Sequence, residues 1–244
     1  MMIRFITETG IEVPAVTAGQ MREIDRIAME ETGPNLYQMM ENAGRNLASL
    51  AMELLGDRWN KSKIVVLAGS GGNGGGGICA ARHLANRNAN VTLCLANPDR
   101  LGSVPQFQHK IYQNTTGKTI GLEQFKNEKY DLIIDALIGY SLKGAPTGVI
   151  LQLIRWANQA KTPILSLDVP SGVDASTGET PGEFIRADLT ITLALPKTGL
   201  LPAKTGDLYL ADIGIPPGTY KRIGLDYASP FDKKYSIHLK VQQY

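Results

Sequence analysis

The spacing of hydrophobic residues along this 244-residue chain changes several times, and the changes mark the predicted elements. Apolar residues that recur every three or four positions are typical of amphipathic helices. Such spacing predicts helices at about 17–32, 35–55, 75–88, 103–114 and 146–160. Short runs of wholly apolar, often β-branched residues are typical of buried parallel strands. Such runs predict strands at 64–68, 91–95, 132–137, 164–167, 189–195 and 208–211.

Strands and helices alternate along most of the chain, which predicts right-handed βαβ units and an α/β fold. The central sheet is therefore expected to be mostly parallel, with helices on both faces. No linker or internal repeat interrupts the alternation, so we expect a single domain. Residues 1–14 and 229–244 fall outside the pattern and are expected to be tails or edge segments.

Composition and charge exclude several classes of protein. The apolar fraction of 43% is ordinary for a globular protein and argues against disorder of the whole chain. The net charge is only +2 and no basic stripe is present, which argues against nucleic-acid binding. No apolar run is long enough to cross a bilayer, so no membrane span is expected. Cys79 and Cys94 lie in apolar surroundings without a Cys/His cluster, which argues against structural zinc and favours reduced thiols in the cytoplasm.

A glycine-rich run follows the first predicted strand, where ligands of open α/β sheets bind. From Gly69 to Gly77, only Ser70 and Asn73 are not glycine. Glycine permits positive φ and close approach of a ligand, and free N–H groups at the start of a helix attract phosphate. We therefore predict an anion site, with a merely flexible turn as the alternative. A P-loop is excluded because no Gly-Lys-Ser/Thr sequence closes the run.

Polar residues also follow the later strands. Asp168 comes directly after the fourth strand, where an ionised side chain needs a partner. Lys197, after the fifth strand, could pair with Asp168 or with a ligand phosphate, or could be a solvated loop residue. Asn73, Asp135 and Ser171 offer oxygen ligands from three strand ends, which suits a hard cation. One carboxylate among neutral oxygens favours a monovalent ion, although Asp135 could instead cap a helix or bracket a loop.

Together these motifs resemble the NAD(P)H-hydrate epimerase family, also called the YjeF N-terminal domain. The resemblance covers about residues 16–226. It rests on motifs that occur in order at 21–25, 40–45, 68–84, 135–148, 168–174 and 196–200. It implies a Rossmann-like three-layer αβα sandwich, commonly dimeric, so a homodimer is expected.

The resemblance also implies an activity, which is the interconversion of the R and S forms of hydrated NADH or NADPH. A separate NAD(P)H-hydrate dehydratase that takes one epimer could then repair the whole pool. A potassium ion is implied, with Asn73, Asp135 and Ser171 as ligands. As a mechanism, Asp168 would handle protons while the C6 hydroxyl is lost and regained through an iminium-like intermediate, and Lys197 would assist or hold phosphate. The implied substrate contacts are Gly72, Asn73, Gly74, Gly75, Gly76, Gly139, Tyr140, Ser141, Leu142, Lys143 and Asp168.

The sequence departs from the family pattern at the predicted ligand loops. Gly72 and Gly76 replace the usual Asn and Asp, and Tyr140-Ser141 replaces the usual Thr-Gly. Two other hypotheses therefore stay open. One is a nucleotide-binding or protein-interaction module with weakened catalysis, and the other is an α/β enzyme acting on another nucleotide or phosphorylated metabolite. The retained carboxylates, serine and lysine favour the epimerase.

Overall fold

The protein is described by a computed structural model that covers residues 3–125 and 128–243. The strands of this part form one ten-stranded sheet in the order β2-β1-β10-β9-β8-β7-β6-β3-β4-β5. The strands from β9 to β5 pair in parallel, and β10, β1 and β2 continue the sheet in antiparallel pairs. Their bounds are Ile3–Thr7 (β1), Glu12–Val13 (β2), Lys63–Ala68 (β3), Asn90–Leu95 (β4), Lys118–Ile120 (β5), Leu132–Ala136 (β6), Ile164–Leu167 (β7), Leu189–Leu193 (β8), Asp207–Ala211 (β9) and Ser236–Gln243 (β10).

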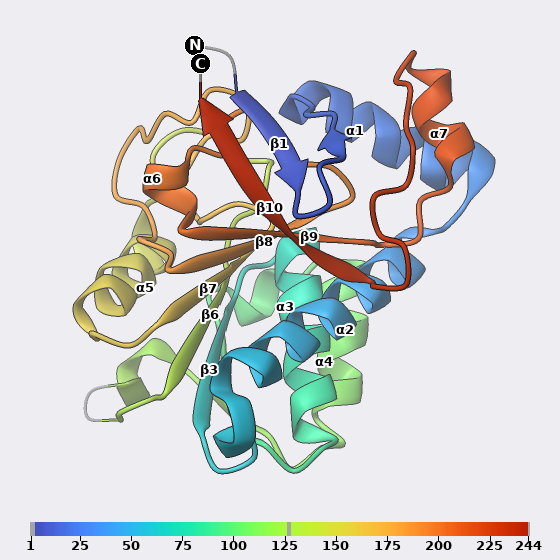
Figure 1. Cartoon of the computed structure of the whole chain (residues 1–244). Coiled ribbons are helices and arrows are strands. Elements are labelled where there is room, and N and C mark those ends of the chain that lie inside the picture. Colours follow the sequence, from blue (N-terminus) through green and yellow to red (C-terminus); the bar gives the residue numbers. More distant parts are fainter. Residues whose placement is uncertain (1–2, 126–127, 244) are drawn as a thin grey trace.

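Helices cover both faces of the sheet, which confirms the three-layer α/β fold (Figure 1). One face packs against α1 to α4 and α7 through a large apolar core, and α5 covers the other face through a smaller core. The helices are Ala18–Ile27 (α1), Leu36–Leu55 (α2), Gly72–Ala85 (α3), Ser103–Tyr112 (α4), Gly148–Gln159 (α5), Pro202–Thr205 (α6) and Pro217–Arg222 (α7). Shorter helical turns lie at Ala28–Thr32 (η1), Gly56–Arg58 (η2), Pro98–Arg100 (η3) and Leu122–Phe125 (η4).

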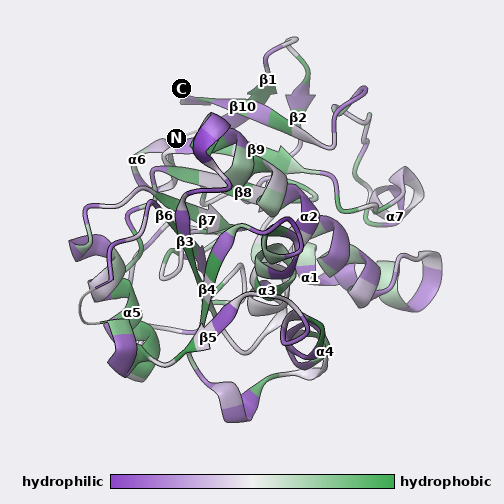
Figure 2. Cartoon of the chain, turned by 90° about the horizontal axis from the view of Figure 1, so that it is seen from below, coloured by the Kyte–Doolittle hydropathy of each residue, from purple (hydrophilic) through white to green (hydrophobic). Residues whose placement is uncertain are grey.

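The hydrophobic pattern explains why these elements form. Thr17 and Gln20 form the predicted capping box at the start of α1, and Asn35 and Gln38 form a second one at α2. Hydrophobic residues run along the central strands, and the helices carry hydrophilic residues on their outer sides (Figure 2). None of the helices within the described residues combines the length and apolarity that a membrane crossing requires.

The terminal segments correct one expectation. Residues 3–7, 12–13 and 236–243 are strands at one edge of the sheet, where β1 pairs with both β10 and β2. The alternative of an edge segment is therefore right for these residues, and a free tail is wrong. Their alternation was missed because these edge strands bury only some of their residues, among them Phe5 and Leu239.

The sheet order creates a switch point for ligand binding. From β3 the chain moves outward through β4 and β5 and then returns to β6 on the opposite side of β3. The loops after β3 and β6 therefore leave the sheet in opposite directions, which opens a crevice at the carboxyl ends of the strands. At Gly69 the two loops touch, because a Cβ atom there would collide with the carbonyl group of Leu137.

Candidate active site

A cavity of about 320 Å³ opens at this switch point, and we call it the active-site cavity. Its walls come from α1, the start of α2, the start of α3, the loop after β6 and the ends of β7 and β8. Its volume lies at the lower end of the range for small-molecule sites. It brings together six of the predicted site residues, namely Gly72, Asn73, Gly139, Tyr140, Ser141 and Asp168.

Asp168 and Lys197 form a buried ion pair at the base of this cavity. Their side chains are only 4% and 1% exposed, and Lys197 Nζ bonds Asp168 Oδ1 directly. The ammonium group also donates to the Leu193 carbonyl at 2.8 Å and to Thr192 Oγ1 at 3.3 Å. Asp168 Oδ2 accepts from the Tyr140 backbone N–H at 3.1 Å. The predicted pairing of Lys197 with Asp168 is confirmed, and the solvated loop lysine is excluded.

The backbone holds both members of the pair in place. Asp168 has φ +67°, a left-handed conformation that is costly for a residue with a side chain and is often found at functional sites. Its N–H donates to the Ile191 carbonyl of β8 at 2.8 Å. The segment that contains Lys197 forms a parallel bridge with Val16, just before α1. The lysine is therefore fixed by residues far away in the sequence.

Asp135 and Ser171 lie together beneath the loop after β6. Asp135 is completely buried, and its two oxygens accept from Ser171 Oγ at 2.6 Å, Ser171 N at 2.9 Å, Ser166 Oγ at 2.9 Å and Leu137 N at 3.2 Å. Ser171 Oγ also accepts from Ile138 N at 2.8 Å. Burial raises the pKa of Asp135, and the hydrogen bonds from Ser171 and its other partners oppose this change. The network joins β6, β7 and the two loops that follow them.

Asn73 lies on the cavity wall close to Gly139 and Asp168. A Cβ atom on Gly139 would lie 3.1 Å from Asn73 Oδ1 and 3.0 Å from Asp168 Oδ2, so only glycine allows these groups to approach so closely. The amide nitrogen of Asn73 is buried and has no hydrogen-bond partner among the described residues. Buried amides are rarely left unpaired, so a ligand group is expected there.

The glycine run has a packing role that the sequence did not predict, and the anion site predicted for it stays a prediction. The helix begins at Gly72 rather than near residue 75, and none of the glycines from 69 to 77 has a positive φ. Gly74, Gly75 and Gly76 are buried inside α3 and do not line the active-site cavity. A Cβ atom on Gly74 would collide with the Gly69 carbonyl, and one on Gly77 with Ala136. These glycines let α3 pack closely against the sheet and the neighbouring helices.

The two positions that depart from the family pattern differ in their surroundings. Gly72 lines the cavity, and a Cβ atom there would have no neighbour within 4 Å. A Cβ atom at Gly76 would lie only 2.8 Å from Leu167 Cδ2. Space is therefore left open at position 72, whereas at position 76 it is filled by Leu167.

Leu142 and Lys143 are the other predicted substrate contacts outside the cavity lining. Leu142 is half-buried and Lys143 is exposed in the loop between β6 and α5. Neither belongs to the cavity wall as the described residues define it.

Sequence reasoning missed the contribution of α1. Asp25 lines the cavity, and its carboxylate accepts a 2.5 Å hydrogen bond from the Tyr140 hydroxyl. Burial raises the pKa of Asp25 to about 6, while Tyr140 and Lys197 lower it and Asp168 raises it. Burial raises the pKa of Tyr140 as well. The sequence signals for Asp25 are its place beside the apolar face of α1 and its position in the motif at 21–25, for which no site role was predicted.

A second polar cluster lies outside the active-site cavity. Glu41, Cys79 and His83 bring three potential ligand atoms within 4.8 Å of one another. However, Arg82 Nη2 already bonds both oxygens of Glu41, at 2.5 and 2.7 Å, and lies 3.3 Å from Cys79 Sγ. Burial raises the pKa of the Cys79 thiol to about 12. The cluster is therefore an ion-pair network centred on Arg82.

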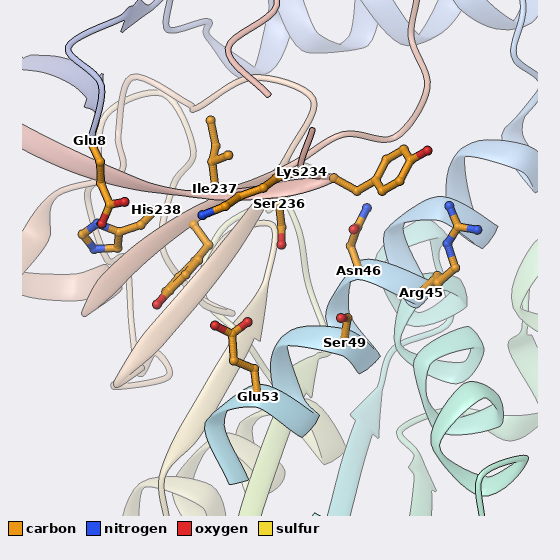
Figure 3. Close-up of a pocket in the computed structure, with 11 residues that line it drawn as sticks. Glu8, Arg45, Asn46, Ser49, Glu53, Lys234, Ser236, Ile237 and His238 are labelled. Carbon is orange, nitrogen blue, oxygen red and sulfur yellow. The ribbon is translucent and has the colours of Figure 1, made fainter. Parts of the chain in front are cut away.

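A larger cavity, of about 490 Å³, lies between α2 and β10, and we call it the edge cavity (Figure 3). Glu53 and Arg45 reach it from α2, and Glu8 and His238 lie close together at its far side (Figure 3). The His238 Nδ1 to Glu8 Oε1 distance is 3.9 Å. None of the predicted site residues lines this cavity in the described part of the chain.

Comparison with known proteins agrees with the resemblance seen in the sequence. The family model of the YjeF-related protein N-terminus matches residues 36–199. The chain is 51% identical, over the whole length of both proteins, to an NAD(P)H-hydrate epimerase of Dehalogenimonas lykanthroporepellens. It is 37% identical to the bifunctional NAD(P)H-hydrate repair enzyme Nnr of Moorella thermoacetica, where the match covers 82% of this chain and 40% of that enzyme. The fold is similar to the crystal structure of yeast YNL200c, with a TM-score of 0.78 and 23% identity over 93% of this chain and all of that one.

Proposed function

The chain belongs to the family of the YjeF-related protein N-terminus, and from this premise we propose that it is an NAD(P)H-hydrate epimerase. In this role it interconverts the R and S forms of hydrated NADH or NADPH. The full-length relative named for this activity supports the proposal. The site geometry supports it independently.

One observation carries the proposal, and it is the buried Asp168–Lys197 pair at the wall of a cavity that begins at a helix N-terminus. Asp168 lies at the carboxyl end of β7, and α3 begins at Gly72 on the same cavity. The first N–H groups of α3 have no acceptor within the helix, so they can bind the pyrophosphate of a dinucleotide. A helix start that can bind phosphate suits the pyrophosphate of a hydrated nicotinamide dinucleotide, and a carboxylate beside it suits proton transfer at the C6 hydroxyl.

The residues of this chain would divide the reaction as follows. The start of α3 holds the phosphates, and the cavity wall from Leu36 and Met40 excludes water from the nicotinamide ring. Asp168, held as a carboxylate beside Lys197, accepts a proton from the water that adds at C6, and in the reverse step the acid so formed returns this proton to the leaving hydroxyl. Lys197 donates its hydrogen bonds to Asp168, Thr192 and Leu193. We therefore assign it to positioning Asp168 rather than to binding phosphate.

The proposal includes a potassium ion held by Asn73, Asp135 and Ser171. Their donor set consists of one carboxylate with an amide and a hydroxyl oxygen, which fits a monovalent hard cation. The unpartnered amide of Asn73 also supports it, because the oxygen and nitrogen of an amide exchange places when it is flipped. When bound, the ion would offset the charge of the buried Asp135 and brace the loops around the cavity.

A binding assay tests the ion without measuring turnover. If the ion binds only the folded state, KCl should raise the melting temperature more than NaCl or LiCl at equal ionic strength. Asp135→Asn should remove the difference between the salts. Equal melting temperatures in all three salts would contradict the potassium site.

The wider setting is part of the proposal. The chain spans about two-fifths of the bifunctional relatives, whose names describe NAD(P)H-hydrate repair. We therefore propose that a separate dehydratase uses one epimer and depends on this chain for the other. The expected homodimer, the cytoplasmic location and the absence of nucleic-acid and membrane partners stay predictions, and size-exclusion chromatography with light scattering tests the dimer.

Incubation of the protein with one purified epimer of hydrated NADH tests the function. We expect the other epimer to accumulate faster than in buffer, as followed by chromatography, until both reach equilibrium. Binding of the epimer without any conversion would instead favour the module with weakened catalysis.

A further inference from the structure

The proposed reaction moves a hydroxyl group from one face of the nicotinamide ring to the other. Leaving and returning each require a proton transfer, and in the two epimers the hydroxyl lies on opposite faces. Asp168 is held by Lys197, by the Tyr140 N–H and by the residues at the end of β8, so its carboxylate is fixed in one position. A fixed group of this kind cannot reach both faces of a bound ring.

Tyr140 connects this position to a second acid. Its backbone N–H donates to Asp168 Oδ2 at 3.1 Å, and its hydroxyl donates to Asp25 Oδ2 at 2.5 Å. The two carboxyl groups therefore lie at opposite ends of one tyrosine, and all three residues line the active-site cavity.

We propose that the Tyr140 hydroxyl is a second proton-transfer group, which acts on the face of the ring that Asp168 cannot reach. Asp25 positions this hydroxyl and supplies its proton. The proposal rests on the epimerase function above and adds a residue pair to it. In this role Tyr140 is the catalytic residue that touches the substrate, and Asp25 is its positioning residue and proton reservoir.

The proton balance of the reaction is closed. As the hydroxyl leaves, Tyr140 donates its proton to it, the C6–O bond breaks to release water, and the N1 electron pair forms the N1=C6 bond. Asp25 enters this step as a protonated carboxylic acid, gives its proton to Tyr140 and becomes the carboxylate that accepts the Tyr140 hydrogen bond. When water adds to the opposite face, the new C6–O bond forms, the electron pair returns to N1 and Asp168 accepts the water proton. The reverse direction exchanges the two roles, and solvent resets both groups.

The charges around Asp25 suit a donor that works near neutral pH. Lys197 and Asp168 face Asp25 from the strand ends, Tyr140 faces it from the loop after β6, and Arg22 and Arg26 share the cavity wall on α1. Burial is the largest effect and raises the pKa of Asp25 to about 6. A carboxyl group that titrates there can both give and take a proton at physiological pH.

The resemblance to the family does not account for the tyrosine of this pair, although Asp25 lies in the motif at 21–25. A tyrosine stands at position 140, where the family pattern usually has threonine. A threonine hydroxyl is much closer to the backbone than a tyrosine hydroxyl, so it could not span the distance from Asp168 to Asp25. The relay is therefore a feature of this chain.

Steady-state kinetics of Tyr140→Phe, Asp25→Asn and the control Tyr235→Phe test the proposal. Tyr235 is 64% exposed and belongs to the edge cavity, so its variant undergoes the same chemical change outside the active-site cavity. With a single epimer of hydrated NADH as substrate, Tyr140→Phe should lose about 100-fold in kcat with KM changed less than about threefold. Asp25→Asn should lose the limb of the pH–rate profile that lies near pH 6, and Tyr235→Phe should match the wild type.

The outcomes separate this proposal from the function on which it rests. An active wild type whose Tyr140→Phe variant keeps its kcat, or whose Asp25→Asn variant keeps the limb near pH 6, overturns the relay and leaves the epimerase intact. A wild type that converts neither epimer faster than buffer overturns the epimerase and the relay together. Circular dichroism of each variant identifies any loss of rate that comes from unfolding.

Discussion

The active-site cavity and the edge cavity both have oppositely charged side chains in or next to their walls, but these side chains differ greatly in their exposure to solvent. Asp168 and Lys197 are 4% and 1% exposed, and they are in direct contact. Glu8 and His238 are 64% and 31% exposed and lie 3.9 Å apart. The edge cavity is the larger of the two, at about 490 Å³ against about 320 Å³. Cavity size therefore does not indicate where the chemistry lies.

The difference teaches that a reactive site is recognised by the free energy needed to desolvate its charged groups. An exposed pair such as Glu8 and His238 is screened by water and contributes little to stability. A buried pair costs several kcal/mol to desolvate and persists only when its geometry and additional hydrogen bonds compensate. The active-site cavity is lined by one member of such a pair, Asp168, and by a half-buried acid, Asp25, and groups of this kind cluster at functional sites.

Asp168→Asn should have the largest effect on activity. The amide cannot accept a proton in the reaction, so turnover of a single epimer should fall by about 10²- to 10⁴-fold. Glu53→Gln makes the same change at an exposed acid of the edge cavity and should leave turnover within about twofold of the wild type. Equal losses in both variants would break the distinction between the two cavities.

Gly76→Asp, which restores the usual family residue, should have the largest effect on stability. Its Cβ atom would lie 2.8 Å from Leu167 Cδ2, and its carboxylate would be buried among apolar groups. Overpacking and burial of the charge should together lower the free energy of unfolding by about 3 kcal/mol. Urea denaturation measures this value.

Gly72→Asn is the matched control for that substitution, because it also restores a family residue on α3. Its side chain enters open space, so stability should stay within about 0.5 kcal/mol of the wild type. If the new amide reaches the bound substrate, KM should fall. A stability loss as large as that of Gly76→Asp would contradict the packing described for the two positions.

The sequence predicted the sheet, the long helices and several cavity residues, because these depend on local rules. Apolar runs identified the buried strands, and the carboxyl ends of those strands brought Asp168 and Tyr140 to one place. The role of the glycine run was not predictable in the same way. The composition shows that this run has few side chains, but it does not show whether a ligand or a neighbouring helix packs against its main chain.

Asp25 could not be predicted because its position depends on a long-range contact. The segment before α1 pairs with the segment that holds Lys197, through a bridge between Val16 and Lys197. Residues separated by about 180 positions in the sequence set the direction of α1. The hydrophobic periodicity identified the buried face of α1, but it could not show that the neighbouring Asp25 would face the loop after β6.

Asp25→Asn should have a smaller effect, on the pH dependence of stability. An aspartate whose pKa rises from 3.8 to about 6 on folding binds more protons in the folded state, so wild-type stability should fall as the pH rises through this window. The variant lacks this loss and should be more stable by about 1–2 kcal/mol above pH 6, with little difference near pH 4. Chemical denaturation at both pH values measures the free energy of unfolding, and an equal gain in stability at both would contradict the raised pKa of Asp25.

The smallest effect is expected from His238→Gln in the edge cavity. The Glu8–His238 contact is exposed and long, so its loss should change stability by less than about 0.5 kcal/mol. Thermal unfolding at low and high salt measures it. A loss above 2 kcal/mol would show that the edge cavity also depends on a costly charge.

The most direct test follows one epimer of hydrated NADH by chromatography with the wild type, Asp168→Asn and Glu53→Gln side by side. The account predicts rapid appearance of the other epimer with the wild type and with Glu53→Gln, and conversion close to the rate in buffer with Asp168→Asn. Full activity of a folded Asp168→Asn variant would contradict the assignment of the chemistry to the buried pair.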